Sequence, residues 1–210
     1  MLNRIIVATL KAVRTLYHRH EGMAAVEYAM VLPLFVIMTV GGFELGKVYM
    51  VNSSLEGAIS NATRTAMTGN VPNSYTNRSD YIADIVLSNL EDAGVTSGVT
   101  ISMQVYGSFA DIGEPEPYVD ANNNSQYDPG ECFSDINDNT VWDDDMGSSG
   151  AGGEENIVLM SVDINLPYMT GIMAHMMGGQ DSINLSASTV IRNEPFGGVA
   201  WEPSSNVICT

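Results

Sequence analysis

Basic residues are scarce in this chain and are missing from its main body. Only eight Lys and Arg stand against 25 Asp and Glu, which gives a formal net charge of −17. Four of the eight lie in residues 1–22, and none lies between Ser79 and Ile191. Nucleic-acid binding depends on cations that neutralise phosphates, so we expect no nucleic-acid partner. Such an acidic surface suits a medium rich in divalent cations, or a basic partner.

Histidine is also rare, which limits the catalytic chemistry open to the chain. Beyond residue 22 the single histidine of the sequence is His175, and no Ser-His-Asp or zinc-ligand arrangement surrounds it. We therefore expect no enzyme. Copper binding by His175 and nearby methionines is one alternative. However, the spacing of Met169, Met173 and Met176 is typical of a helix face that packs on a core or a membrane surface.

One apolar run, residues 23–43, is long enough to cross a bilayer, and Glu27 is its single charge. Basic residues precede the run, which predicts a cytoplasmic N-terminus and a translocated remainder. A secretory signal peptide has a shorter apolar region. A plain membrane anchor explains the length but not Glu27, because a carboxylate in a span costs on the order of 2.5–3.5 kcal/mol.

The residues around Glu27 favour a third interpretation. Gly22 to Tyr28 read GMAAVEY, of the form G-x-x-x-x-E-Y. This segment resembles the processing site of type IV pilins, especially the Flp prepilins and pseudopilins of tight-adherence (Tad) systems. The resemblance implies that a prepilin peptidase cleaves between Gly22 and Met23, and that Glu27 pairs with the new amine of a neighbouring subunit. Such an ammonium offsets the cost of a carboxylate in lipid.

Two further blocks resemble TadE-like proteins. Residues 26–33, VEYAMVLP, end at Pro33 and are similar to the V-E-[FY]-A-x-[VL]-x-P signature of that family. Near the other end a segment resembles the R-N-E-P-[FY] block that often closes its domain. This second block consists of Arg192, Asn193, Glu194, Pro195 and Phe196.

The resemblance implies a minor pilin-like membrane subunit that assists assembly of a Tad/Flp type IV pilus used in adherence. Its expected partners are other pilin-like subunits, Tad assembly proteins, a prepilin peptidase and membrane lipid. Its expected location is the bacterial inner membrane, single-pass, with the C-terminal domain in the periplasm or on the pilus. A calcium-dependent, membrane-anchored surface adhesin or sensor is the alternative function.

The helical pattern continues beyond the span and predicts one helix from about 23 to 68, ended by Gly69 and Pro72. A span followed by a separate surface helix is the alternative. A second helix, capped by Ser79 or Asp80, is expected to run to about Ala93. Alternation over 99–105, 158–166 and 183–191 predicts three strands. The predicted seam of the long helix consists of Leu45, Val48, Asn52, Leu55, Ile59, Ala62 and Ala66.

These elements indicate an α+β, pilin-like fold, in which a long N-terminal helix packs on a small antiparallel sheet. We divide the chain into five segments. They are a leader (1–22), a transmembrane segment (23–43), the helical spine with the second helix and first strand (44–110), an acidic insert (111–155) and the remaining strands with the tail (156–210).

The insert contains 13 acidic residues and no basic one, and part of it resembles an EF-hand calcium loop. Oxygen-bearing side chains occupy positions 1, 3, 5, 7, 9 and 12, although Ser125 replaces the usual turn glycine and no flanking helices are evident. An Asn/Asp-rich turn satisfied by its own backbone is the alternative. The predicted calcium ligands are Asp120, Asn122, Asn124, Gln126, Asp128 and Glu131.

The pattern repeats fifteen residues later, with Tyr127 and Trp142 in register. Its twelfth position is Met146, so Asp144 or Asp145 is expected to close the second loop. The ligands predicted for this loop are Asp135, Asn137, Asn139, Val141, Asp143 and Asp145.

The chain has two cysteines, Cys132 in the acidic insert and Cys209 in the tail. In a reducing compartment they would stay thiols, whereas an oxidising one favours a disulfide between them. Such a bridge would tie the insert to the tail and contribute about 4 kcal/mol through the entropy of the unfolded chain.

Overall fold

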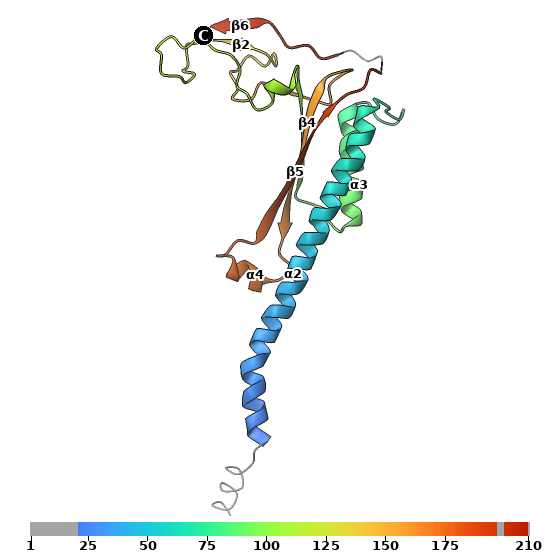
Figure 1. Cartoon of the computed structure of the whole chain (residues 1–210), viewed down its shortest axis with the longest axis vertical. Helices are drawn as coiled ribbons and strands as arrows, with labels where there is room; N and C mark the ends of the chain where they lie inside the picture. The colour runs from blue at the N-terminus through green and yellow to red at the C-terminus, as the bar shows by residue number, and fades with distance from the viewer. Residues whose placement is uncertain (1–20, 197–199, 210) are drawn as a thin grey trace, which may run out of the picture.

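The computed structural model describes residues 21–196 and 200–209, so residues 1–20 of the predicted leader lie outside the described part. The first described element is α2 (Glu21–Met67), one uninterrupted helix of 47 residues that includes Pro33. At 1.5 Å per residue it is about 70 Å long, and its N-terminal half projects away from the rest of the chain (Figure 1). The predicted single helix is confirmed, and the alternative of two separate helices is wrong.

The C-terminal half of α2 buries an apolar seam against the rest of the domain. Leu45 was expected to begin this seam, but its side chain is 66% exposed. The reason is that Glu44, and not Leu45, faces the rest of the domain at that turn, where it accepts hydrogen bonds from Thr170. The buried seam consists of Val51, Leu55, Ala58, Ile59, Ala62 and Ala66.

A second helix, α3 (Arg78–Asp92), packs beside α2 and buries Ile82, Val86 and Leu90. Its N-cap is Asn77, so the predicted cap at Ser79 or Asp80 is wrong by two to three residues. The Asn77 side chain does not accept from the helix backbone; its amide donates to the Asp80 carboxylate at 3.2 Å. Gly94, at φ +80°, follows the helix, where a left-handed conformation favours glycine.

A four-stranded antiparallel sheet in the order β3-β1-β4-β5 completes the core. Its strands are β1 (Val99–Tyr106), β3 (Ser148–Ser149), β4 (Ile157–Pro167) and β5 (Ser182–Arg192). Figure 1 shows the long β4–β5 pair running alongside α2. The three predicted strands are confirmed, and so is the α+β arrangement of a long helix on a small antiparallel sheet. Between β4 and β5 the chain forms the short helix α4 (Gly171–Met176).

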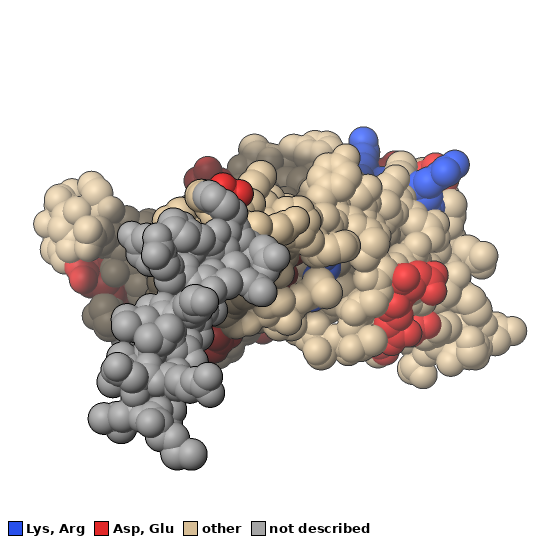
Figure 2. Space-filling model, turned by 90° about the horizontal axis from the view of Figure 1, so that it is seen from below, with Lys and Arg blue, Asp and Glu red and all other residues tan. Residues whose placement is uncertain are grey.

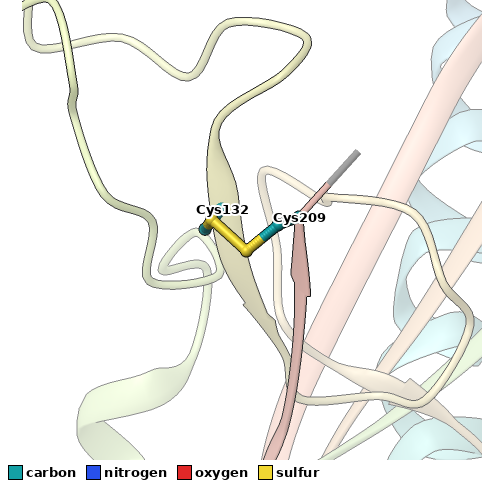
Figure 3. The surroundings of a disulfide bond; sticks show 2 residues. All are labelled: Cys132 and Cys209. Atoms are coloured by element: carbon teal, nitrogen blue, oxygen red, sulfur yellow. A yellow bond between two sulfur atoms is a disulfide. The ribbon is translucent and has the colours of Figure 1, made fainter.

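The acidic insert lies between β1 and β4 and is folded onto the C-terminal tail. It begins with the 3₁₀ turn η1 (Phe109–Asp111), and its strand β2 (Cys132–Asp135) pairs antiparallel with β6 (Asn206–Cys209). Cys132 and Cys209 face each other in this ribbon and form a disulfide with an S–S distance of 2.11 Å (Figure 3). The bond closes a separation of 77 residues and ties the insert to the tail.

Candidate functional site

No described residue of the chain covers the projecting half of α2. The most apolar 18-residue window of this helix has a mean hydropathy of 2.0 and is 0% buried, so it is not the core helix of a folded domain. Its length and composition suffice to cross a membrane. One apolar N-terminal helix of this kind is consistent with a single-pass membrane anchor.

The residues of the processing motif lie on the first turns of this helix. Gly22 has no heavy atom within 4 Å of the position where a Cβ would stand, and Met23 is 57% exposed. Glu27 is exposed and makes no hydrogen bond or ion pair with another described residue. Met23 and Glu27 are four residues apart and therefore share one face of the helix. Tyr28, at 74% exposure, lies beside them.

The R-N-E-P-F block is part of the domain's framework. Asn193 is 2% exposed, and its amide donates to the carbonyl oxygens of Ala151 and Gly153 at 3.0 and 2.7 Å. Its own Oδ1 accepts from the Arg78 guanidinium at 2.8 Å. That guanidinium also donates to the Ala66 carbonyl at the end of α2. Asn193 therefore joins β5, the end of α2 and the start of α3.

The remaining residues of the block are more exposed. Phe196 lies under the Arg78 guanidinium, 4.7 Å from its centre to the ring centroid, and closes over Gly69, where a Cβ would collide with the ring. Glu194 donates its backbone N–H to the Met67 carbonyl at 3.1 Å. Arg192 makes an exposed ion pair with Glu155 at 3.7 Å, and Pro195 is exposed. The block thus acts as a structural clamp at the far end of α2.

In the first acidic loop, the side chains predicted as calcium ligands form hydrogen bonds with the backbone of the loop and with one another. Asp120 accepts the backbone N–H of Asn124 at 3.1 Å through Oδ1 and that of Ser125 at 2.8 Å through Oδ2. The side-chain amides of Asn122 and Asn124 both donate to Oδ2 of Asp128, at 2.6 and 2.7 Å. Ser125 adopts φ +63°, the left-handed conformation that the usual turn glycine supplies.

The second loop repeats this geometry atom for atom. Asp135 accepts from Asn139 and Thr140 at 3.0 and 2.9 Å, and the amides of Asn137 and Asn139 donate to Oδ2 of Asp143 at 2.8 and 2.6 Å. The positive-φ residues also recur, Asp138 at 62° and Thr140 at 69°. The rings of Tyr127 and Trp142 stack between the loops, with centroids 4.6 Å apart.

The carboxylate that closes the first loop is the predicted one, whereas the second loop is closed by a residue that was not predicted. Glu131 accepts from the backbone N–H of Ala121 at 2.8 Å and of Asp128 at 3.0 Å. In the second loop the matching N–H groups, Ile136 and Asp143, donate at 2.7 and 3.2 Å to Glu116.

Glu116 was not among the predicted ligands, and the structure places it where Asp144 or Asp145 was expected. The carboxylate of Asp145 instead accepts from the Tyr106 hydroxyl at 3.0 Å and from the Gly147 N–H at 3.1 Å. Burial and this hydrogen bond raise the pKa of Tyr106. Burial also raises the pKa of Glu116, which is fully buried. No local pattern could have identified Glu116, because it precedes the first loop yet closes the second, which begins nineteen residues later.

The donor chemistry of both loops fits a hard cation such as Ca²⁺, which takes six to eight oxygens. Turning each Asn amide by 180° would exchange its nitrogen for its oxygen and bring oxygens together at Asp128 and Asp143. Across residues 21–196 and 200–209, however, no group of three or more His, Cys, Asp or Glu is close enough to hold a metal ion. A cation here would therefore depend on amide and backbone oxygens. Gln126 and Val141 are exposed, so Val141 would contribute only its carbonyl.

An open cavity of about 460 Å³ adjoins the second loop. It leads from the edge of the sheet to the side chains that converge on Asp143, so this loop is accessible from solvent. Its lining residues include Gln104, Asn137, Asn139, Asp143, Asp144 and Asp145.

The comparisons with known proteins bear on α2. The model of the TadE family, described as TadE-like protein, matches residues 22–64, which run from the processing motif into the seam. The match confirms the resemblance for this part of the chain. The clamp and the acidic insert lie outside it. No curated protein and no solved structure matches the chain.

Proposed function

With the TadE-like match over residues 22–64 as premise, we propose that this chain is a minor pilin-like subunit that is cleaved after Gly22 and assists assembly of a Tad/Flp type IV pilus. The family is one of structural proteins associated with a pilus, which supports a role without catalysis. The proposed location is the bacterial inner membrane, with the acidic domain in the periplasm or on the pilus.

The observation that carries this proposal is Glu27, a carboxylate on a bare apolar helix surface. Cleavage after Gly22 creates an ammonium at Met23, one helical turn away. A carboxylate in lipid is costly, and a nearby cation offsets that cost. Because both groups lie on the exposed surface of α2, they are free to pair with the same groups on a companion pilin-like helix. That pairing docks the subunit beside its neighbours.

Co-expression with and without the cognate prepilin peptidase tests this function. The wild-type chain should become shorter by its leader only when the peptidase is present, as seen by gel mobility and intact mass. Gly22→Val should block the change, and Gly41→Val is the matched control because both glycines have open space around the added Cβ. Retention of the leader by the wild-type chain, or equal blockage by Gly41→Val, would contradict the proposal.

For the insert we propose calcium binding that rigidifies the exposed end of the subunit. The specific support is the pair Glu116 and Glu131, which meet matching backbone N–H groups in the two loops. Bound Ca²⁺ stabilises the native state, by about 2.7 kcal/mol at a concentration of 100 times Kd. We expect Ca²⁺ to raise the Tm of the solubilised chain more than equimolar Mg²⁺ does.

Variants separate this proposal from the alternative of a turn satisfied by its own backbone. Glu131→Gln and Glu116→Gln should each reduce the Ca²⁺-dependent rise in Tm, whereas exposed Glu114→Gln should leave it unchanged. If Ca²⁺ does not change the Tm of the chain, there is no such site. If Ca²⁺ binding is lost and piliation persists while adherence fails, the insert serves as a calcium-dependent adhesin or sensor on the same anchor.

A further inference from the structure

The connection between β4 and β5, residues 168–181, presents an apolar surface that no described residue covers. Its helix α4 has no buried residue, so of the two surfaces expected opposite these methionines, a core or a membrane, the core is wrong. Met169 and Met176 are 61% and 60% exposed, and Ile172 and Met177 are 42% and 52% exposed. Exposed apolar residues gathered in one segment mark a binding surface more often than scattered ones do.

Hydrogen bonds join this segment to α2 at Glu44 and Lys47. Oε1 of Glu44, a residue only 2% exposed, accepts from the backbone N–H and the hydroxyl of Thr170 at 2.8 and 3.2 Å. Lys47 donates to the Pro167 carbonyl at 3.0 Å. In Figure 1, α4 lies beside α2, at the end of the sheet where the projecting half of the helix begins.

That level coincides with the expected membrane boundary. Residues 23–43 rise about 30 Å at 1.5 Å per residue, which is the thickness of the hydrocarbon core. Glu44 is the next residue, so its partner Thr170 and the following helix lie where lipid headgroups begin. Phe43 and Leu45 on α2 are 71% and 66% exposed, and they continue the apolar surface of the span to the same level.

Charge distribution also favours lipid at this end of the molecule. Residues 168–180 contain no Asp or Glu, in a chain that has 25; the one carboxylate of the connection, Asp181, stands at its end next to β5, where the Asp181 carbonyl accepts from the Tyr168 N–H at 3.0 Å. Seen from below, most of the surface outside the grey atoms is formed by uncharged residues, with separate acidic patches and a few basic groups (Figure 2). An uncharged apolar loop avoids the desolvation cost that a carboxylate would pay near hydrocarbon.

We propose that the 168–181 connection is a second membrane contact, in which α4 lies in the headgroup region of phospholipid beside the exit of α2. Amphipathic helices at membrane interfaces bury their apolar face by about 5–10 Å into the boundary between headgroups and acyl chains. The six-residue α4 is shorter, but its exposed Ile172 and Met176 present side chains of the same apolar chemistry. A single span leaves a domain free to rotate about the helix axis. A second contact fixed to Glu44 and Lys47 sets one orientation of the outer domain. The inference rests on the membrane span alone and holds whether or not the leader is removed.

Fluorescence quenching of the full chain in phosphatidylcholine nanodiscs, one copy per disc, tests the contact. Met176→Cys carries an environment-sensitive fluorophore, attached under non-reducing conditions so that the native disulfide persists. Val141→Cys on the insert is the matched control, because the two native side chains are 60% and 61% exposed. The label at 176 should shift to the blue and lose intensity when the discs contain headgroup-level spin-labelled lipid. The label at 141 should do neither.

A second variant separates lipid contact from a folding effect. Ile172→Asp in the Met176→Cys background places a carboxylate on the surface of α4, where the native side chain is 42% exposed and no residue of the helix is buried. It should reverse the blue shift and reduce lipid quenching while leaving the Tm of the domain unchanged. Equal quenching at 176 and 141 would overturn the proposal. Protection of residue 176 that appears only with several copies per disc, without lipid quenching, would also overturn it and assign the surface to a second copy.

Discussion

The two halves of α2 share one continuous backbone yet meet different surroundings. From Val51 to Ala66 the apolar residues keep to one stripe and are buried by α3 and the sheet. From Met23 to Phe43 they cover every face, and the helix is bare. A helix that is apolar all round needs an apolar environment, whereas a stripe needs only a core. The same helix therefore has one half whose composition suits lipid and one half packed in a folded domain.

The largest effect should come from truncating the packed half. Leu55→Ala removes a fully buried side chain and should lower the free energy of unfolding by about 2–5 kcal/mol. Ile37→Ala, the matched change in the bare half, should leave domain stability unchanged because no protein packs on it. Urea unfolding of the solubilised chain, followed by tryptophan fluorescence, measures both. Similar losses for the two variants would erase the distinction between the halves.

A smaller effect should follow from opening the clamp at the packed end of α2. Asn193→Ala leaves the Ala151 and Gly153 carbonyls and the Arg78 guanidinium without their partner, which should cost about 1–3 kcal/mol. Asn184→Ala, at an exposed position of the preceding strand β5, loses only a solvent-exposed hydrogen bond from Asn165 and is the control; it should change stability by less than about 0.5 kcal/mol. The same urea titration applies. If Asn193→Ala is neutral, the clamp does not hold the end of the helix.

The smallest effect should come from the exposed ion pair made by Arg192, the residue before Asn193. Arg192 and Glu155 are 3.7 Å apart, and their side chains are 60% and 62% exposed. Arg192→Ala should therefore lower stability by at most about 1 kcal/mol, less in high salt. A loss as large as that of Asn193→Ala would mean that Arg192 contributes through packing, and the salt dependence of the urea midpoint distinguishes the two cases.

The periodicity of apolar residues predicted the helix and the strands that bury one face against the core. Alternating apolar residues predicted the strands β1, β4 and β5, and apolar residues three or four apart predicted the packed half of α2. Both patterns arise because a strand or helix that buries one face repeats its apolar residues with its own period. The acidic loops were recognised as repeats because their Asp and Asn spacing is local.

Residues brought together from distant segments were harder to predict. Glu116 serves a loop that begins nineteen residues later, and β6 pairs with a strand 70 residues away, with no local signal for either. The role of Asn193 depends on Arg78 from another helix. The methionines of α4 had the right helical spacing, but spacing alone does not say whether a core or a membrane lies opposite.

The central claim is that the bare half of α2 is a pilin-type docking helix that begins at Met23. N-terminal sequencing of the chain, purified from membranes that contain the cognate peptidase, tests it most directly. The account predicts a sequence that starts Met-Ala-Ala-Val-Glu, with the carboxylate at the fifth position. A chain that still starts at Met1 would contradict it, because Glu27 would then have no new amine with which to pair.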